Sequence, residues 1–214
     1  MADPPVSSGG HPLPEHESLR QIALSEAKVG NYDDAIALFD ALLAENPLSA
    51  TDYNNRGLVH FKCQHHAQAL ADYNMAIALD ASLDSVYNNR ANYYAHHGDL
   101  LGALLDYDMA IDLNPYNVRA WINQGITFRD LKMYGRALEC LDVALSFGTL
   151  QDHVFLERGR TYHLRGDWNC AIADYQRVIT YVVEISSHLG EREIRLLEQA
   201  ENGIDELLAP LTLS

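Results

Sequence analysis

The sequence predicts an all-α fold, a right-handed α-solenoid of antiparallel helix pairs. The first observation is a period of 34 residues that divides the chain into the segments 16–49, 50–83, 84–117, 118–151 and 152–185. The second is an alanine at one fixed place in every segment: Ala35, Ala69, Ala103, Ala137 and Ala171. The third is the helical spacing of apolar residues within each segment. A fixed period of this length is typical of solenoids, in which each unit stacks on its neighbours.

Each segment is predicted to hold two helices, and 84–117 shows the pattern most clearly. Its first helix places Tyr87 and Tyr94 on one face, and a second helix follows after the turn His97-Gly98-Asp99. Glycine is expected to end the first helix and aspartate to cap the second. A further small column lies in the first helices and should allow close approach of the two backbones: Ala23, Gly57, Ala91, Gly125 and Gly159.

The two ends of the chain depart from the period. Residues 1–15 contain Pro4-Pro5 and a Ser-Gly run, which predict a flexible N-terminal tail, and they have neither the basic nor the apolar region of a signal peptide. Residues 186–214 are predicted to form a C-terminal capping helix and tail, with the helix over 190–208 and one apolar stripe: Ile194, Leu197, Ile204 and Leu208. The alternative is a helix that docks into a groove and regulates access to it.

Composition narrows the class of partner. The formal net charge of −15 should repel nucleic acid and anionic lipid surfaces, and no apolar run is long enough to predict a membrane span. The basic residues concentrate in 118–214, where 10 stand against 14 acidic ones. Cys63, Cys140 and Cys170 form no Cys-x-x-Cys pair, which favours a reducing compartment, either the cytoplasm or an organelle interior.

The residue pattern resembles the tetratricopeptide repeat (TPR) family. The segment 84–117 supplies its aromatic, small and closing proline positions: Tyr87, Ala91, Tyr94, Ala103, Tyr107, Ala110 and Pro115. Glu26 departs from the pattern, since an aromatic stands at its place in the family. The resemblance covers residues 16 to about 181 and implies a TPR superhelix that binds other proteins.

Two positions of the segments change together. Arg56, Arg90 and Arg158 recur at position 7, and position 23 of the same segments carries an aspartate: Asp72, Asp106 and Asp174. The segment 118–151 has Gln124 and Cys140 there, and the first segment has Ile22 and Leu38. We infer an Arg–Asp pair that joins the two helices of a segment. Shared ancestry of the copies is the alternative explanation.

Asparagines mark a candidate binding face on the first helices. Asn55, Asn89 and Asn123 occupy one position in successive segments, and Asn92 lies on the same face. The amide of asparagine both donates and accepts, so a spaced row could hold an extended peptide backbone. This is similar to the asparagine ladder of some TPR superhelices, whose concave groove holds a partner peptide. The alternative is that asparagine serves packing or solubility at this position.

Three arginines lie on or beside that face: Arg119, Arg129 and Arg160. In an acidic chain they suggest a local site for a carboxylate-bearing partner. Alternatively, they pair with neighbouring acidic residues. The lysine, asparagine and arginine pattern with which some TPR adaptors clamp chaperone tails is absent, so binding of that kind is not expected.

No cofactor, catalytic site or metal site is expected. The sequence lacks a phosphate-binding loop, a Gly-x-Ser-x-Gly motif and a His-Glu-x-x-His motif, and the cysteines have no evident histidine partner in the repeat register. His65-His66 and His96-His97 are expected to be exposed turn residues.

The sequence therefore indicates a non-catalytic scaffold or adaptor that binds another protein in its groove, as an assembly factor or a co-chaperone. The alternative is a self-associating module, such as a homodimer, joined through its last helix or its convex face.

Overall fold

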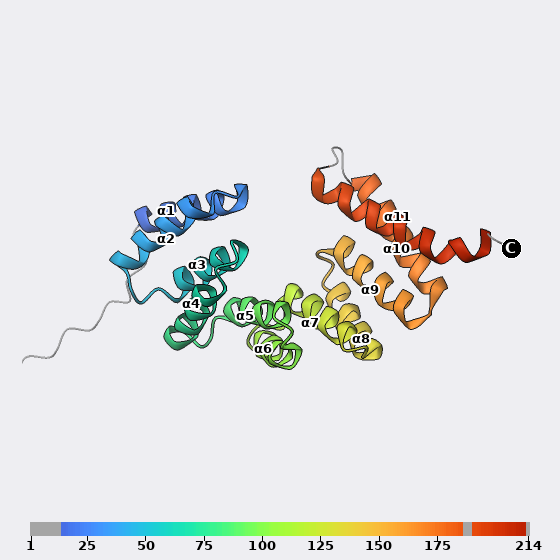
Figure 1. Ribbon diagram of the computed structural model, residues 1–214, viewed down its shortest axis with the longest axis horizontal. Coiled ribbons are helices and arrows are strands. Elements are labelled where there is room, and N and C mark those ends of the chain that lie inside the picture. Colours follow the sequence, from blue (N-terminus) through green and yellow to red (C-terminus); the bar gives the residue numbers. More distant parts are fainter. Residues whose placement is uncertain (1–13, 186–189, 213–214) are drawn as a thin grey trace, which may run out of the picture. The chain divides into compact units, whose positions relative to one another are not determined.

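The computed structural model describes residues 14–185 and 190–212, and within these ranges it contains eleven helices and no strand (Figure 1). The predicted all-α solenoid architecture is therefore confirmed. Most of the predicted flexible tail, residues 1–15, lies outside the described residues, and its last two residues already belong to the first helix. None of the described helices combines the length and the apolar character needed to cross a membrane.

The first ten helices follow one another in pairs whose members are separated by short turns. They are α1 (Pro14–Val29) and α2 (Tyr32–Glu45), α3 (Ala50–Lys62) and α4 (His66–Leu79), α5 (Asp84–His96) and α6 (Leu100–Leu113), α7 (Val118–Asp130) and α8 (Tyr134–Ser146), and α9 (Gln151–Arg165) and α10 (Trp168–Ile185). The last helix, α11 (Glu191–Thr212), packs against α10 and α9.

The chain divides into two compact units, residues 1–89 and 90–214, with the boundary inside α5. In the first unit α1 packs on α2, α2 on α3, and α3 on α4, around a core that includes Phe39, Leu42 and Val59. In the second unit the same order of contacts runs from α6 to α11. Within each unit every helix therefore packs mainly on its neighbours in the sequence, as a solenoid requires.

The two columns of small residues are buried where paired helices meet. A Cβ atom on Gly57 would lie 2.8 Å from the ring of Tyr73, and one on Gly159 would lie 2.9 Å from the ring of Tyr175. The alanines of the second helices are fully buried. Small residues are therefore needed here because an aromatic ring or a backbone fills the remaining space.

The turn inside each helix pair has one backbone feature in common. One of the two residues that follow the first helix adopts a left-handed φ, between +60° and +92°: Gly30, Gln64, Gly98, Lys132 and Gly166. Asp99 then caps α6, as predicted, by accepting a hydrogen bond from the backbone N–H of Gly102. The turn thus keeps its geometry even where glycine is replaced.

The predicted Arg–Asp pairs are present within the helix pairs. Arg56 donates to both oxygens of Asp72 at 2.6 and 2.8 Å, and these bonds raise the pKa of the Arg56 guanidinium. Arg90 contacts Asp106, and Arg158 contacts Asp174, in the same bidentate way.

In the segment 118–151 the corresponding neutral pair also meets. The thiol of Cys140 donates to Oε1 of Gln124 at 3.3 Å, and burial raises the pKa of Cys140 to about 11. Covariation of these two positions therefore reflects direct contact between the paired helices.

The apolar stripe predicted for the last helix is confirmed in part, because Leu197 and Ile204 pack against the core while Ile194 and Leu208 do not. Ile194 and Leu208 are 42% and 40% exposed, whereas the side chains buried against α10 and α9 are Leu196, Ala200 and Leu207. Small residues on α11 allow close approach to α10, since a Cβ on Gly203 would lie 2.6 Å from the ring of Tyr175.

Candidate peptide-binding surface

The first unit holds two of the predicted ladder asparagines, and the structure gives them different surroundings. Asn55 is half-buried and has no hydrogen-bond partner among the described residues. Asn89 donates its Nδ2 to Oδ1 of Asn54, which lies on the preceding first helix, at 2.9 Å. Asn54 was not a predicted site residue. Its buried amide oxygen accepts the hydrogen bond from the Asn89 side chain that a bound peptide would otherwise accept.

In the second unit Asn92 has a structural partner. Its Oδ1 accepts a hydrogen bond of 2.6 Å from the hydroxyl of Tyr107, which is buried. Tyr73 occupies the corresponding place in the preceding segment, and its buried hydroxyl has no partner within the described part of the chain because Leu58 stands where Asn92 would be. Asn92 therefore provides the hydrogen-bond acceptor for the buried hydroxyl of Tyr107.

Two of the three candidate arginines converge on one buried carboxylate. Arg129 donates to Oε2 of Glu157 at 2.5 Å, and Arg160 donates to Oε1 at 2.7 Å. The Glu157 side chain is only 8% exposed, so the two cations compensate a charge that would be costly to bury alone. The pairing matches the alternative weighed for these arginines, in which acidic neighbours hold them.

A pocket of about 610 Å³ opens beside this triad, between α7, α9, α10 and α11. The buried ring of Tyr175 forms part of its wall, and burial raises the pKa of that hydroxyl to about 12. The last helix supplies four lining residues that the repeat pattern could not indicate: Gln199, Asn202, Gly203 and Glu206. The wall carries charges of both signs.

A second pocket, of about 400 Å³, has basic residues but no acidic residue in its lining. Arg119 and Asn123 from α7, His153 of α9 and Arg192 of α11 line it, together with the apolar side chains of Ile122 and Leu150. Arg119 is exposed, and no carboxylate of the described residues pairs with it. Of the three candidate arginines it is the one whose charge remains available to a ligand.

A smaller pocket continues this surface along the last helix. It shares His153 and Arg192 with the second pocket and adds Arg195 and Gln199 from α11. Arg192 also donates to the buried carboxylate of Asp152 at 2.7 Å, which fixes α11 against the start of α9. We define the basic surface as the lining of these two adjoining pockets. It joins the predicted Arg119 and Asn123 to arginines from outside the repeats.

Comparison with known proteins shows which sequences and folds this chain is similar to. Residues 20–84 match a family model described as tetratricopeptide repeat. PilW, a widely conserved type IV pilus biogenesis factor, is similar in structure with a TM-score of 0.75 at 17% identity, over 94% of this chain and 94% of that one. A thermophilic TPR protein of Thermus thermophilus gives 0.73 at 18% identity, over 88% and 98% of the chains.

A third similar structure is a tetratricopeptide repeat protein of Parabacteroides merdae, with a TM-score of 0.69 at 19% identity, over 92% of this chain and 73% of that one. Such identities establish a shared fold, while the family match in residues 20–84 rests on the sequence itself. Residues 20–84 therefore match the tetratricopeptide repeat by sequence, and the helix pairs share the fold of tetratricopeptide repeat proteins.

Proposed function

We propose that the chain is a non-catalytic scaffold that binds an extended, carboxylate-bearing segment of another protein at the basic surface on α7, α9 and α11. The observation that carries the proposal is that Arg119, Asn123, His153 and Arg192 line one pocket in a chain of net charge −15. Arg119 has no carboxylate partner among the described residues, whereas Arg192 also binds Asp152. Arginine presents several N–H donors that match a carboxylate, and the asparagine amide can bind a peptide backbone.

Two apolar side chains in the lining of the same pocket support a peptide ligand. Ile122 and Leu150 line the pocket together with the arginines, so a segment with alternating acidic and apolar side chains could fill the site. Affinity would come from buried apolar contacts, and the arginines would select acidic sequences. Asn55, which has no hydrogen-bond partner among the described residues, is a separate candidate contact in the first unit.

A role in assembly is the pathway class that we infer. The similar structures include a type IV pilus biogenesis factor and a component of the hetero-tetramer Cut9–Hcn1, which are named for assembly and for complex formation. Cysteines that form no disulfide in the structure support a reducing compartment for this role.

The test is fluorescence anisotropy with labelled extended peptides that differ only in Asp/Glu against Asn/Gln content. Arg119→Ala should weaken binding of the acidic peptides about 10- to 150-fold, since a charge-assisted hydrogen bond contributes about 1.5–3 kcal/mol. Arg136→Ala is the matched control, because Arg136 is exposed on α8, away from the pockets. Equal binding of acidic and neutral peptides would refute the proposal, as would equal losses in the two variants.

Self-association remains a second candidate because of a specific feature of α6. Four large apolar side chains follow at intervals of four residues and are all exposed: Leu101, Leu105, Met109 and Leu113. Sedimentation velocity over a range of concentrations tests this candidate. A dimer that disappears on Leu101→Gln/Leu105→Gln substitution would support it, and a monomer at every concentration would rule it out.

A further inference from the structure

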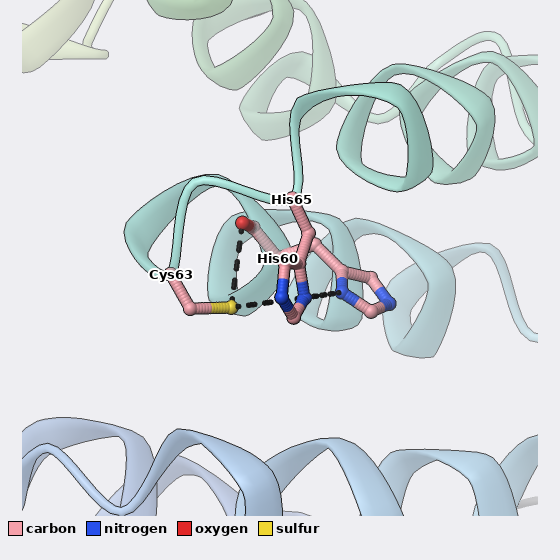
Figure 2. A group of neighbouring side chains, drawn as sticks. All are labelled: His60, Cys63 and His65. Atoms are coloured by element: carbon pink, nitrogen blue, oxygen red, sulfur yellow. Dashed lines mark hydrogen bonds between the residues drawn. The ribbon is translucent and has the colours of Figure 1, made fainter.

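Three side chains of types that can bind metal ions lie close together at the turn between α3 and α4 (Figure 2). Nδ1 of His60 lies 3.4 Å from Nδ1 of His65, and Sγ of Cys63 lies 3.4 Å from the same His65 nitrogen. All three donor atoms are within 4.8 Å of one another. We propose that His60, Cys63 and His65 bind one zinc-class divalent cation through two imidazoles and a thiolate, with a fourth coordination position left for water or a partner's donor.

The separations suit a tetrahedral ion. Zinc binds imidazole nitrogen at about 2.0–2.1 Å and thiolate sulfur at about 2.3 Å, so the edges of its tetrahedron are about 3.3 Å between two nitrogens and about 3.6 Å between nitrogen and sulfur. Both contacts of His65, at 3.4 Å, lie near these edges. A small side-chain rotation that brings Sγ of Cys63 closer to Nδ1 of His60 places all three donor atoms on one face of the tetrahedron.

The backbone holds the three residues in place. The N–H of His65 donates to the carbonyl of His60 at 2.8 Å, which closes the end of α3, and Gln64 between the ligands has a φ of +62°. This left-handed residue reverses the chain, so that Cys63 before it and His65 after it turn toward the same side. Binding therefore requires ordering of side chains alone.

The same turn brings the corresponding positions together elsewhere in the chain. In the segment 16–49, Asn31 donates to Glu26 at 2.7 Å, and these are the counterparts of His65 and His60. In the segment 152–185, Arg165 donates to Asp167 at 2.5 Å, and these are the counterparts of Cys63 and His65. The close approach is thus a property of the repeat turn, and only the segment 50–83 fills all three positions with imidazole or thiol groups.

One of the proposed ligands, His60, also lies near a carboxylate. Nε2 of His60 lies 3.9 Å from Oδ2 of Asp72, the same carboxylate that Arg56 binds. When Nδ1 of His60 binds a metal, the ring proton must lie on Nε2, and a facing carboxylate favours that tautomer. His60 and Cys63 are half-buried while His65 is exposed, so an ion can reach the site from solvent.

The binding step has a simple proton balance. In the structure the Cys63 thiol donates to the carbonyl oxygen of Val59 at 3.1 Å. The cation takes the place of that proton on sulfur, and one proton is released to solvent for each ion bound. No electron transfer is involved. The site lies in the first unit, so the proposal is independent of the basic surface in the second.

The experiment is a Co²⁺ titration of the full chain, stripped with a chelator and kept reduced with a phosphine that does not bind metals. One equivalent should saturate the protein with a thiolate-to-cobalt charge-transfer band, and added Zn²⁺ should abolish the band. Cys63→Ser should remove the band, and His65→Ala should weaken Co²⁺ binding at least about 100-fold. Circular dichroism establishes that each variant keeps its helices.

Two matched controls separate this site from adventitious binding. Cys170→Ser removes an exposed cysteine, and His97→Ala changes the residue at the Cys63 position of the next segment. Both variants should bind Co²⁺ as the wild type does. The proposal is overturned if the band survives Cys63→Ser, if His65→Ala binds as tightly as wild type, or if bound Co²⁺ gives no thiolate band.

Discussion

Asp174→Ala is expected to destabilise the protein far more than Asp142→Ala, although both carboxylates bind the same arginine. Arg158 donates to the two oxygens of Asp174 at 2.7 and 2.9 Å, and to Asp142 at 2.6 Å. The Asp174 side chain is 2% exposed, whereas that of Asp142 is 57% exposed. Asp174 also accepts a hydrogen bond of 2.8 Å from Arg177, so the comparison measures the effect of burial together with that of the additional hydrogen bonds.

The expected magnitudes follow from these surroundings. Removal of one partner from a fully buried ion pair costs about 3–5 kcal/mol, largely because the other charge remains uncompensated. Arg158 is 12% exposed and keeps its bond to Asp142, so part of its charge stays compensated. We therefore expect Asp174→Ala to lower the free energy of unfolding by about 2–4 kcal/mol. Asp142→Ala should cost about 0–1 kcal/mol, as exposed pairs do.

Urea denaturation followed by far-ultraviolet circular dichroism measures both losses, and urea, being uncharged, does not screen the pair. The double variant Arg158→Met/Asp174→Leu should recover most of the loss, because an apolar pair needs no compensation. Ile22 and Leu38 already occupy these positions in the first segment. Equal losses in the two single aspartate variants, or a double variant no better than Asp174→Ala, would refute the reasoning.

Two further pairs of variants test the packing of the helix pairs by the same measurement. Gly159→Ala should cost about 1–3 kcal/mol because its Cβ would lie 2.9 Å from the ring of Tyr175. Gly135→Ala, with nothing within 4 Å of its Cβ, should instead stabilise α8 by about 0.5–1 kcal/mol. Tyr107→Phe should cost about 0.5–1.5 kcal/mol, since its hydroxyl donates to an asparagine. Tyr73→Phe should be neutral or stabilising because its buried hydroxyl has no partner within the described residues, and similar losses for both tyrosines would contradict this account.

The helix pairs and their internal contacts could be predicted because the repeat supplies several copies of one pattern. Positions 7 and 23 of the segments change together, as Arg56 with Asp72 in one segment and Gln124 with Cys140 in another. This covariation indicated contacts that the structure contains. Each contact joins two helices of one segment, so a single sequence register fixes both positions. Contacts of this kind are visible in one chain without an alignment.

The candidate site could be predicted only in part, because it uses contacts between segments and with the last helix. The sequence indicated Asn89 but not that Asn54 would engage it, and it could not show that Glu157 holds both Arg129 and Arg160. Arg192 belongs to α11, which falls outside the period and therefore has no register from which its position could be read. Side chains of this kind become neighbours only when the fold is known.

The metal-binding cluster was missed for a different reason. Three ligands at positions 60, 63 and 65 do not follow helical spacing, and the family pattern places an aromatic residue where His60 stands. The turn brings such residues together because its left-handed residue redirects the chain after the helix ends. Spacing rules for ligands on a continuous helix do not cover this arrangement.

The repeats themselves offer a way to separate structural from functional side chains. Equivalent positions share one backbone geometry, so a difference between segments changes the chemistry while the geometry stays the same. The position of Arg119 carries Thr51 and Ser85 in the two preceding segments, and in the last two segments it carries Arg119 and His153, which line one pocket. The cation at this position is not needed to build the repeat, since the segments 50–83 and 84–117 fold with a small hydroxyl there. Its charge is therefore available to select a ligand, and substitutions that restore serine should remove binding while they leave the helix pairs intact.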